Sequence, residues 1–248
     1  MKRRAVLGTI GSLASLGVIG YATRDPVDAL EVRFWLSERA ATYPDVVDRI
    51  SEYLSFALDL EYWSLELTYG GVVAVDTEDG ADVTRRGEWP ALVAAGTLGR
   101  GEIEPVGDVN LLVTDGQMQT APTGFGMPHV ASVGGARYIS RLEPLDSLSE
   151  PGESVTYSTP NRVMQVLIHE AGHALGLGHD HGVVHRREST DVATPMLSTY
   201  AWDPEYEGDR SRCGAIYPTD EPVARKLSFS FSQCAQREFE TYSGGFTP

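Results

Sequence analysis

The chain has 248 residues, the length of one domain with a hydrophobic core of ordinary size. Its 35 acidic and 20 basic residues give a formal net charge of −15 at pH 7, which excludes nucleic acid as an expected partner because the phosphates would be repelled. With only two lysines, Lys2 and Lys226, this acidic composition indicates a halophilic microbial protein kept soluble at high salt, the alternative being an ordinary acidic secreted protein.

Residues 1–22 have the pattern of an export signal. Lys2, Arg3 and Arg4 precede an uncharged run that extends from Ala5 to Ala22. The paired arginines favour the twin-arginine route, so we predict an extracellular or cell-surface protein. A retained membrane anchor is the alternative, because a helix rises about 1.5 Å per residue and this run nearly spans a bilayer core. Its glycines make it only mildly hydrophobic, which favours cleavage.

The segment from residue 29 to residue 139 is expected to form several strands and one helix. Residues 29–36 alternate between apolar and polar and are rich in strand formers. Between Pro44 and Asp59 the apolar residues recur at helical spacing, which predicts an amphipathic helix. Further strands are predicted at residues 63–69, 72–75, 108–114, 130–133 and 137–139.

Residues 76–90 are polar and acidic and are predicted to form a loop. Carboxylates of Asp76, Glu78, Asp79 and Asp82 could hold calcium there. A solvated acidic loop on an already acidic protein is the favoured account.

A helix is expected from Thr159 and Pro160, its N-cap and first residue. This helix leads into residues 169–180, which read H-E-x-x-H-x-x-G-x-x-H-D. His169 and His173 stand four residues apart, so they project from one face of the helix and can share one small cation.

Gly176 is expected to end this helix, because glycine tolerates the left-handed conformation of a sharp turn. The turn lets His179 approach the same ion from another direction. Three nitrogen ligands with one open position indicate a catalytic site for one Zn²⁺, whereas a structural site has four protein ligands. Glu170, directly after the first ligand, is placed beside that open position as the catalytic carboxylate.

The complete motif, followed by a methionine, resembles the metzincin metalloproteases. Met196 is the candidate for the family's methionine turn, which lies beneath the zinc; filling a gap in the core is the ordinary alternative. Asp180 after the third ligand resembles the adamalysin branch, whereas the short catalytic domain with few cysteines resembles the matrixins. The resemblance is specific over residues 159–200 and only architectural over residues 29–140.

The resemblance implies an α/β (α+β) fold. Residues 29–176 would form an upper subdomain in which a twisted mixed sheet carries the active-site helix. Residues 177–248 would form a mostly irregular lower subdomain with one helix between Asp220 and Glu240, although Ser228–Phe231 alternate like a strand.

In relatives the substrate lies along an edge strand above the cleft. By position this strand would be residues 130–134 here. His129 at its start could touch substrate or be an ordinary surface histidine. Tyr200 is expected to wall the cleft, since it matches the family's donor tyrosine poorly. The predicted substrate contacts are Val130, Ala131, Ser132, Val133 and Tyr200.

Several residues near the motif have more than one interpretation. His181 and His185 are expected to face solvent, because three ligands already suffice. Asp180 would either orient a ligand through a hydrogen bond or cap backbone amides. Cys213 and Cys234 could form a single disulfide in an exported protein.

These observations predict a monomeric zinc-dependent endopeptidase that acts on proteins or peptides, with Glu170 as general base and acid. Contact with a membrane is expected only through residues 1–22, if they are not cleaved. One alternative is a secreted, non-catalytic zinc-binding or protein-binding module on the same fold. Another is a zinc hydrolase of non-peptide amides.

Overall fold

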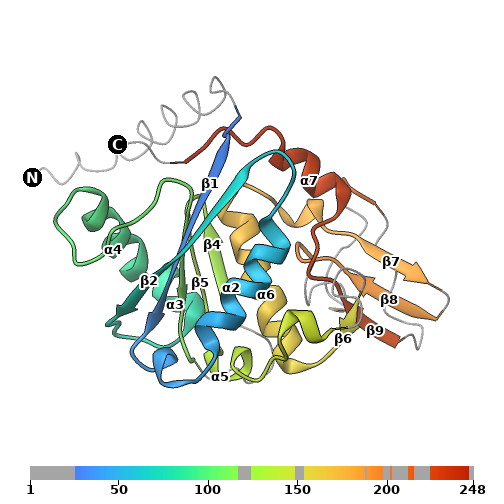
Figure 1. Ribbon diagram of the computed structural model, residues 1–248, viewed down its shortest axis with the longest axis horizontal. Helices are drawn as coiled ribbons and strands as arrows, with labels where there is room; N and C mark the ends of the chain where they lie inside the picture. Colours follow the sequence, from blue (N-terminus) through green and yellow to red (C-terminus); the bar gives the residue numbers. More distant parts are fainter. Residues whose placement is uncertain are drawn as a thin grey trace, which may run out of the picture.

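The computed structural model describes residues 26–116, 124–148, 154–187, 189–197, 202, 212–214 and 224–245. A five-stranded sheet lies between helices on its two faces, and a four-stranded sheet lies beside it (Figure 1). The predicted mixed α/β class is confirmed, and the subdomain division at residue 176 stays a prediction. The expected signal at residues 1–22 lies outside the described residues. None of the described helices has the length and apolarity needed to cross a membrane.

The larger sheet has the strand order β2-β1-β3-β5-β4. All neighbouring pairs are parallel except β5 with β4, which is antiparallel. The two segments predicted at 63–69 and 72–75 form one strand, which pairs with β1 across a register shift near Gly71. The strands are β1 (Ala29–Ser37), β2 (Ser64–Val73), β3 (Val109–Val113), β4 (Gly124–Met127) and β5 (Val130–Val133).

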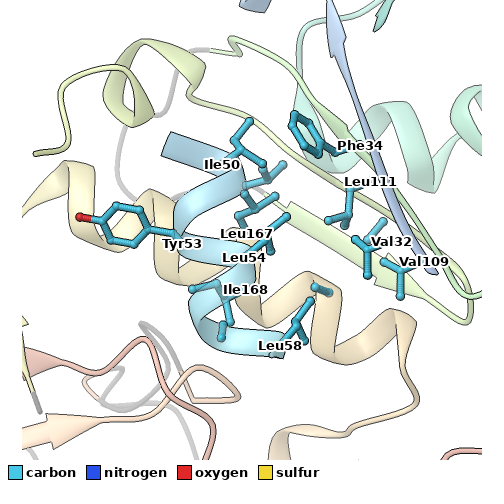
Figure 2. Close-up of a cluster of buried hydrophobic side chains, with 14 of the residues drawn as sticks. Val32, Phe34, Ile50, Tyr53, Leu54, Leu58, Val109, Leu111, Leu167 and Ile168 are labelled. Atoms are coloured by element: carbon cyan, nitrogen blue, oxygen red, sulfur yellow. The ribbon is translucent and has the colours of Figure 1, made fainter. Parts of the chain in front are cut away.

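Both faces of this sheet are covered, so its central strands are apolar on both sides. In β1, Val32 and Phe34 point into the larger core, whereas Trp35 points to the opposite face. Helices α2 (Val46–Leu58) and α6 (Thr159–Ala174) pack on the larger core, and Figure 2 shows side chains of both meeting those of β1 and β3. Their packing fixes α6 against the sheet.

Residues 136–139 also lie on this side of the sheet, as the short helix α5 (Ala136–Ile139). The strand predicted at residues 137–139 is therefore wrong. Gly135 begins the helix with a φ of 95°, a left-handed conformation that glycine adopts without strain, and this turns the chain out of β5.

The opposite face is covered by α3 (Gly80–Arg85) and α4 (Glu88–Thr97), so the loop predicted at residues 76–90 is wrong. Asp79 caps α3 by accepting hydrogen bonds from the backbone N–H groups of residues 81 and 82. Trp89 of α4 packs edge-on against Trp35, with ring centroids 5.2 Å apart. The cap stabilises α3, and the aromatic contact stabilises α4. The polar composition of residues 76–90 shows no periodic pattern that indicates either helix.

The acidic side chains of this region bond to the protein. Glu78 accepts hydrogen bonds from the Ser37 hydroxyl and the Asp115 backbone N–H, both at 2.7 Å. Asp82 pairs with Arg85 and Arg86. Glu78, Asp79 and Asp82 thus have partners within the protein, and a calcium ion at this place stays a prediction.

The second sheet, which the sequence did not predict, has the order β6-β9-β8-β7. The helix predicted between residues 220 and 240 is wrong in its first half, because residues 224–227 form a strand parallel to β8. The helix itself starts after Ser232, whose side chain accepts from the Ala235 N–H. The elements are β6 (Val155–Thr156), β7 (Val184–Arg187), β8 (Thr190–Ala193), β9 (Ala224–Leu227) and α7 (Gln233–Phe239).

Candidate metal centre

Helix α6 carries the first half of the motif. Its N-cap is Ser158, one residue before the predicted position, and the Ser158 side chain accepts a hydrogen bond from the Asn161 N–H. Pro160 stands in the first turn, where its missing N–H costs nothing. The buried apolar residues of the helix lock it into the larger core: Val163, Met164, Leu167, Ile168 and Ala171.

His169, His173 and His179 meet at one point. One nitrogen from each ring lies within 4.8 Å of the other two, and the Nε2 atoms of His173 and His179 are 3.1 Å apart. Two nitrogens bound to one tetrahedral zinc at about 2.0–2.1 Å are separated by about 3.3 Å. Among the described residues, this is the one group of three or more His, Cys, Asp or Glu side chains that could share an ion.

Two of these rings are oriented by backbone carbonyls. Nδ1 of His169 donates to the Pro195 carbonyl at 2.6 Å, and Nδ1 of His173 donates to the Leu177 carbonyl at 2.7 Å. A proton on Nδ1 leaves the lone pair on Nε2, where a metal binds. The donor set therefore fits zinc, for which neutral imidazoles are standard ligands.

Burial keeps the three imidazoles neutral. It lowers the pKa of His169 well below the usual range and also lowers the pKa of His173. The pKa of His179 falls to about 4, mainly through burial and next through the nearby His173, while Asp180 acts in the opposite direction. Unprotonated nitrogens at neutral pH are the form that binds a cation.

The chain reverses after α6 through a Schellman turn. Leu177 N–H donates to the Gly172 carbonyl at 2.9 Å, and Gly176 N–H donates to the His173 carbonyl at 3.0 Å. Gly176 has a φ of 92°, the left-handed conformation that the sequence predicted for it. The turn leads into the short helix η3 (His179–His181), which begins with the third histidine.

Glu170 lies under strand β4. Its side chain is 6% exposed, and a Cβ built on Gly124 would lie 2.5 Å from the Glu170 Oε1. Burial raises the pKa of Glu170 to about 8, against the effect of the Gly126 backbone N–H that hydrogen-bonds its carboxylate. A bound dication would lower this pKa again, because it favours the charged form.

Met196 packs against α6 at Gly172, between His169 and His173. It is 1% exposed, and a Cβ on Gly172 would meet its sulfur at 2.5 Å and the Phe231 ring at 3.0 Å. Pro195, the residue before it, supplies the carbonyl that orients His169. Met196 therefore packs into the core against α6, its segment orients His169, and its role as the family's methionine turn stays a prediction.

The edge strand differs from the one predicted. Residues 130–133 form β5, which is buried and lies between β3 and β4, so the prediction that they form the edge is wrong. The antiparallel strand β4 takes the edge position, because the chain turns back at residues 128 and 129 and the resulting hairpin places β4 on the outer side of β5. His129 is half-buried in a left-handed conformation (φ 69°), and its backbone N–H donates to the Ala174 carbonyl.

The predicted exposure of two histidines has different outcomes. His185 is exposed, whereas the prediction for His181 is wrong, since it is 6% exposed. His181 is buried because its ring contacts Arg212, whose guanidinium donates to Nε2 at 3.0 Å. Asp180 lies 3.2 Å from Nδ1 of the same ring and also faces Arg212. Tyr200 lies outside the described residues.

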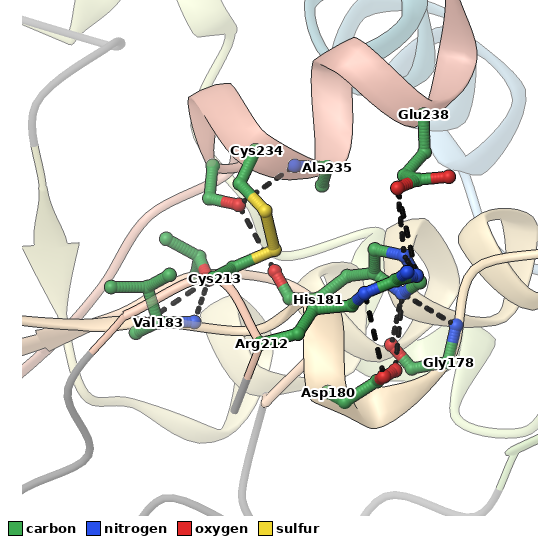
Figure 3. The surroundings of a disulfide bond; sticks show 11 residues. Gly178, Asp180, His181, Val183, Arg212, Cys213, Cys234, Ala235 and Glu238 are labelled. Carbon is green, nitrogen blue, oxygen red and sulfur yellow. Dashed lines mark hydrogen bonds and ion pairs between the residues drawn. A yellow bond between two sulfur atoms is a disulfide. The ribbon is translucent and has the colours of Figure 1, made fainter. Parts of the chain in front are cut away.

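Cys213 and Cys234 form a disulfide with a Cα–Cα distance of 5.4 Å. It joins the segment after residue 211 to the first turn of α7, next to the His181 cluster (Figure 3). The contacts of Gly124, Gly126, Gly172 and Arg212 were not foreseen from the sequence. The glycines at 124 and 126 around Phe125 are the signal that could have indicated a strand passing close to another element.

The sequence matches no known protein-family model and no curated protein sequence. Among solved structures, the chain is similar to the crystal structure of archaemetzincin from Methanopyrus kandleri, with 19% sequence identity. The match covers 84% of this chain and 93% of that one, with a TM-score of 0.37. A superposition this loose leaves the three-histidine centre itself as the basis for any statement about function.

Proposed function

We propose that the protein is a zinc-dependent endopeptidase. The observation that carries the proposal is the convergence of His169, His173 and His179 beside a buried carboxylate, Glu170. Three neutral imidazoles with a free position suit a catalytic zinc ion. When bound there, zinc supplies a Lewis acid that polarises the scissile carbonyl and acidifies water.

Glu170 is the group that moves the proton. It is not one of the three grouped ligands, and its carboxylate is held by the Gly126 backbone N–H. As a general base it accepts the proton of the attacking water, and as a general acid it then gives that proton to the departing amine nitrogen.

The edge of β4 is the proposed binding place for the peptide. This strand pairs with β5 on one side and lies against Glu170 and His173 through its glycines. An extended peptide can add to such an edge as a further strand through backbone hydrogen bonds, whatever its side chains. The scissile bond would then lie beside the carboxylate.

We also propose that the enzyme is exported and works at high salt. The twin-arginine pattern of residues 1–22 and the acidic, lysine-poor composition support this. The Cys213–Cys234 disulfide adds support, because such bridges persist in oxidising compartments.

The experiment is hydrolysis of unfolded casein in several molar salt by the wild type and by Glu170→Ala at equal zinc content. We expect new peptide N-termini with the wild type and a rate at least about a hundredfold lower with the variant. Equal rates would contradict the role of Glu170. Zinc binding without cleavage by either protein would contradict the endopeptidase and favour the non-catalytic module.

A further inference from the structure

The three ligands differ in how they are held. His169 and His173 stand on α6, whose apolar residues are buried in the larger core. His179 stands on η3, a turn of three residues beyond the end of that helix. Its position therefore depends on what holds the turn.

The turn is tied to α7 and to the segment at residue 212. The Ser232 hydroxyl, at the N-cap of α7, donates to the His181 carbonyl at 3.0 Å. The Arg212 backbone N–H donates to the Asp180 carbonyl at 2.9 Å. Two of the three residues of the turn are thus bonded to chain that follows it by more than 30 positions.

Arg212 adds a second set of contacts through its side chain. Its guanidinium lies 3.0 Å from Nε2 of His181, 3.5 Å from Oε1 of Glu238 and 3.9 Å from Oδ2 of Asp180 (Figure 3). Asp180 and Glu238 are each nearly half exposed, so the individual ion pairs contribute little to stability. Their joint effect is on geometry, since they approach one guanidinium from α7 and from η3.

The Cys213–Cys234 disulfide fixes the backbone of this arrangement. Cys213 directly follows Arg212, and Cys234 lies in the first turn of α7, two residues after Ser232. The bridge therefore ties the residue that bonds Asp180 to the helix that bonds His181. We call this set the Arg212 clamp: Arg212, Asp180, His181, Glu238 and the disulfide.

We infer that Arg212, anchored by the disulfide, is a positioning residue for His179, an inference that rests on the proposed zinc site. The clamp holds η3 so that the third imidazole faces the other two before the metal arrives. Preorganised ligands bind more tightly because less order is lost on binding. Substitution of residues that support metal-binding histidines typically lowers the metal affinity by about 10- to 100-fold.

The test is the zinc dissociation constant, measured by competition with a chelating dye. The variants are Arg212→Ala, Glu238→Gln and the double change Cys213→Ser with Cys234→Ser. Arg237→Ala is the matched control, because Arg237 is an exposed arginine of α7 that makes no ion pair with another described residue. We expect roughly tenfold or greater weakening for Arg212→Ala and the cysteine variant, a smaller effect for Glu238→Gln, and no change for the control.

The same substitutions in a His179→Ala background separate positioning from general destabilisation. If the clamp acts through His179, removing it has no further effect on zinc affinity once that ligand is gone. An equal loss in both backgrounds would overturn the inference, as would folded clamp variants that bind zinc within about twofold of wild type. Should the cysteine variant not fold, Arg212→Ala and Glu238→Gln keep the disulfide and decide the question. The readout is independent of peptide cleavage, so an inactive wild type would contradict only the proposed function.

Discussion

The sulfur of Met196 lies directly against Gly172, the residue before the second histidine ligand. A Cβ at position 172 would meet this sulfur at 2.5 Å, closer than real Cβ atoms approach a neighbour. Met196 and the helix that carries His169 and His173 therefore fit against each other at a single glycine.

Gly172→Ala should disturb the centre through this contact. The added methyl group pushes Met196 or the helix away, so we expect a loss of about 1–3 kcal/mol in the free energy of unfolding and weaker zinc binding. Denaturant unfolding and zinc titration measure the two effects. Gly107→Ala is the control, because a Cβ there meets only the Glu31 side chain at 3.4 Å. Equal behaviour of the two variants would show that the contact at Gly172 is unimportant.

Gly124→Ala should affect catalysis more than metal binding. A Cβ at this position would lie 2.5–2.9 Å from three side-chain atoms of Glu170, so the carboxylate must move. Since small displacements of a catalytic group cost up to about a hundredfold, we expect kcat to fall by roughly ten- to a hundredfold. Zinc content should remain that of the wild type. Metal analysis and steady-state kinetics test this, and a loss of zinc would place the defect in the ligands instead.

Glu170→Gln should stabilise the metal-free protein above pH 5. The folded-state pKa of Glu170, about 8, lies above the usual value of 4.5, so the native state holds a proton that the unfolded state releases. The contribution of Glu170 to the free energy of unfolding is fully present below pH 4.5 and is lost as the pH rises towards 8. Glutamine does not titrate, so the difference in melting temperature should grow across this window. A constant difference from pH 4 to pH 8 would contradict the raised pKa.

Acidification should destabilise the metal-free protein through His179. Its pKa of about 4 lies below the unfolded value of 6.5, so the unfolded state binds a proton more readily as the pH falls between these values. We expect the melting temperature to fall over this range, and His179→Gln to flatten the slope. Thermal melts in chelator at several pH values provide the measurement.

Saturating zinc should raise the melting temperature near pH 7, because it binds only the folded site.

The motif made the centre of the site predictable, whereas the surroundings were not. His169, His173 and Gly176 act through spacing along one helix and its end, which is local information. The position of β4 at the edge of the sheet depends on pairing between strands. The sequence of residues 124–127 does not indicate that they pair on the outer side of β5. His181 was assigned to solvent for the same reason, since its partner Arg212 is distant in sequence.

The secondary-structure elements also divide into those that a local sequence pattern predicts and those that it does not. Alternating apolar residues marked β1, a short run of strand formers marked β3, and helical spacing marked α2. Helix α4 is rich in alanine and fully buries only Trp89 and Val93, so its sequence shows little periodicity. The second sheet consists of strands of two to four residues, which are too short for a periodic pattern to appear.

Helix α7 contacts both the turn that carries His179 and the segment directly before β2. Its Gln236 carbonyl accepts a hydrogen bond from the Tyr62 hydroxyl. The rings of Phe239 and Trp63 pack together with their centroids 5.6 Å apart. During synthesis the first two ligands leave the ribosome long before this helix does. The nascent chain can therefore build its sheet and α6 while the three-histidine centre is still incomplete, and the proposed peptidase activity would arise as the last event of folding.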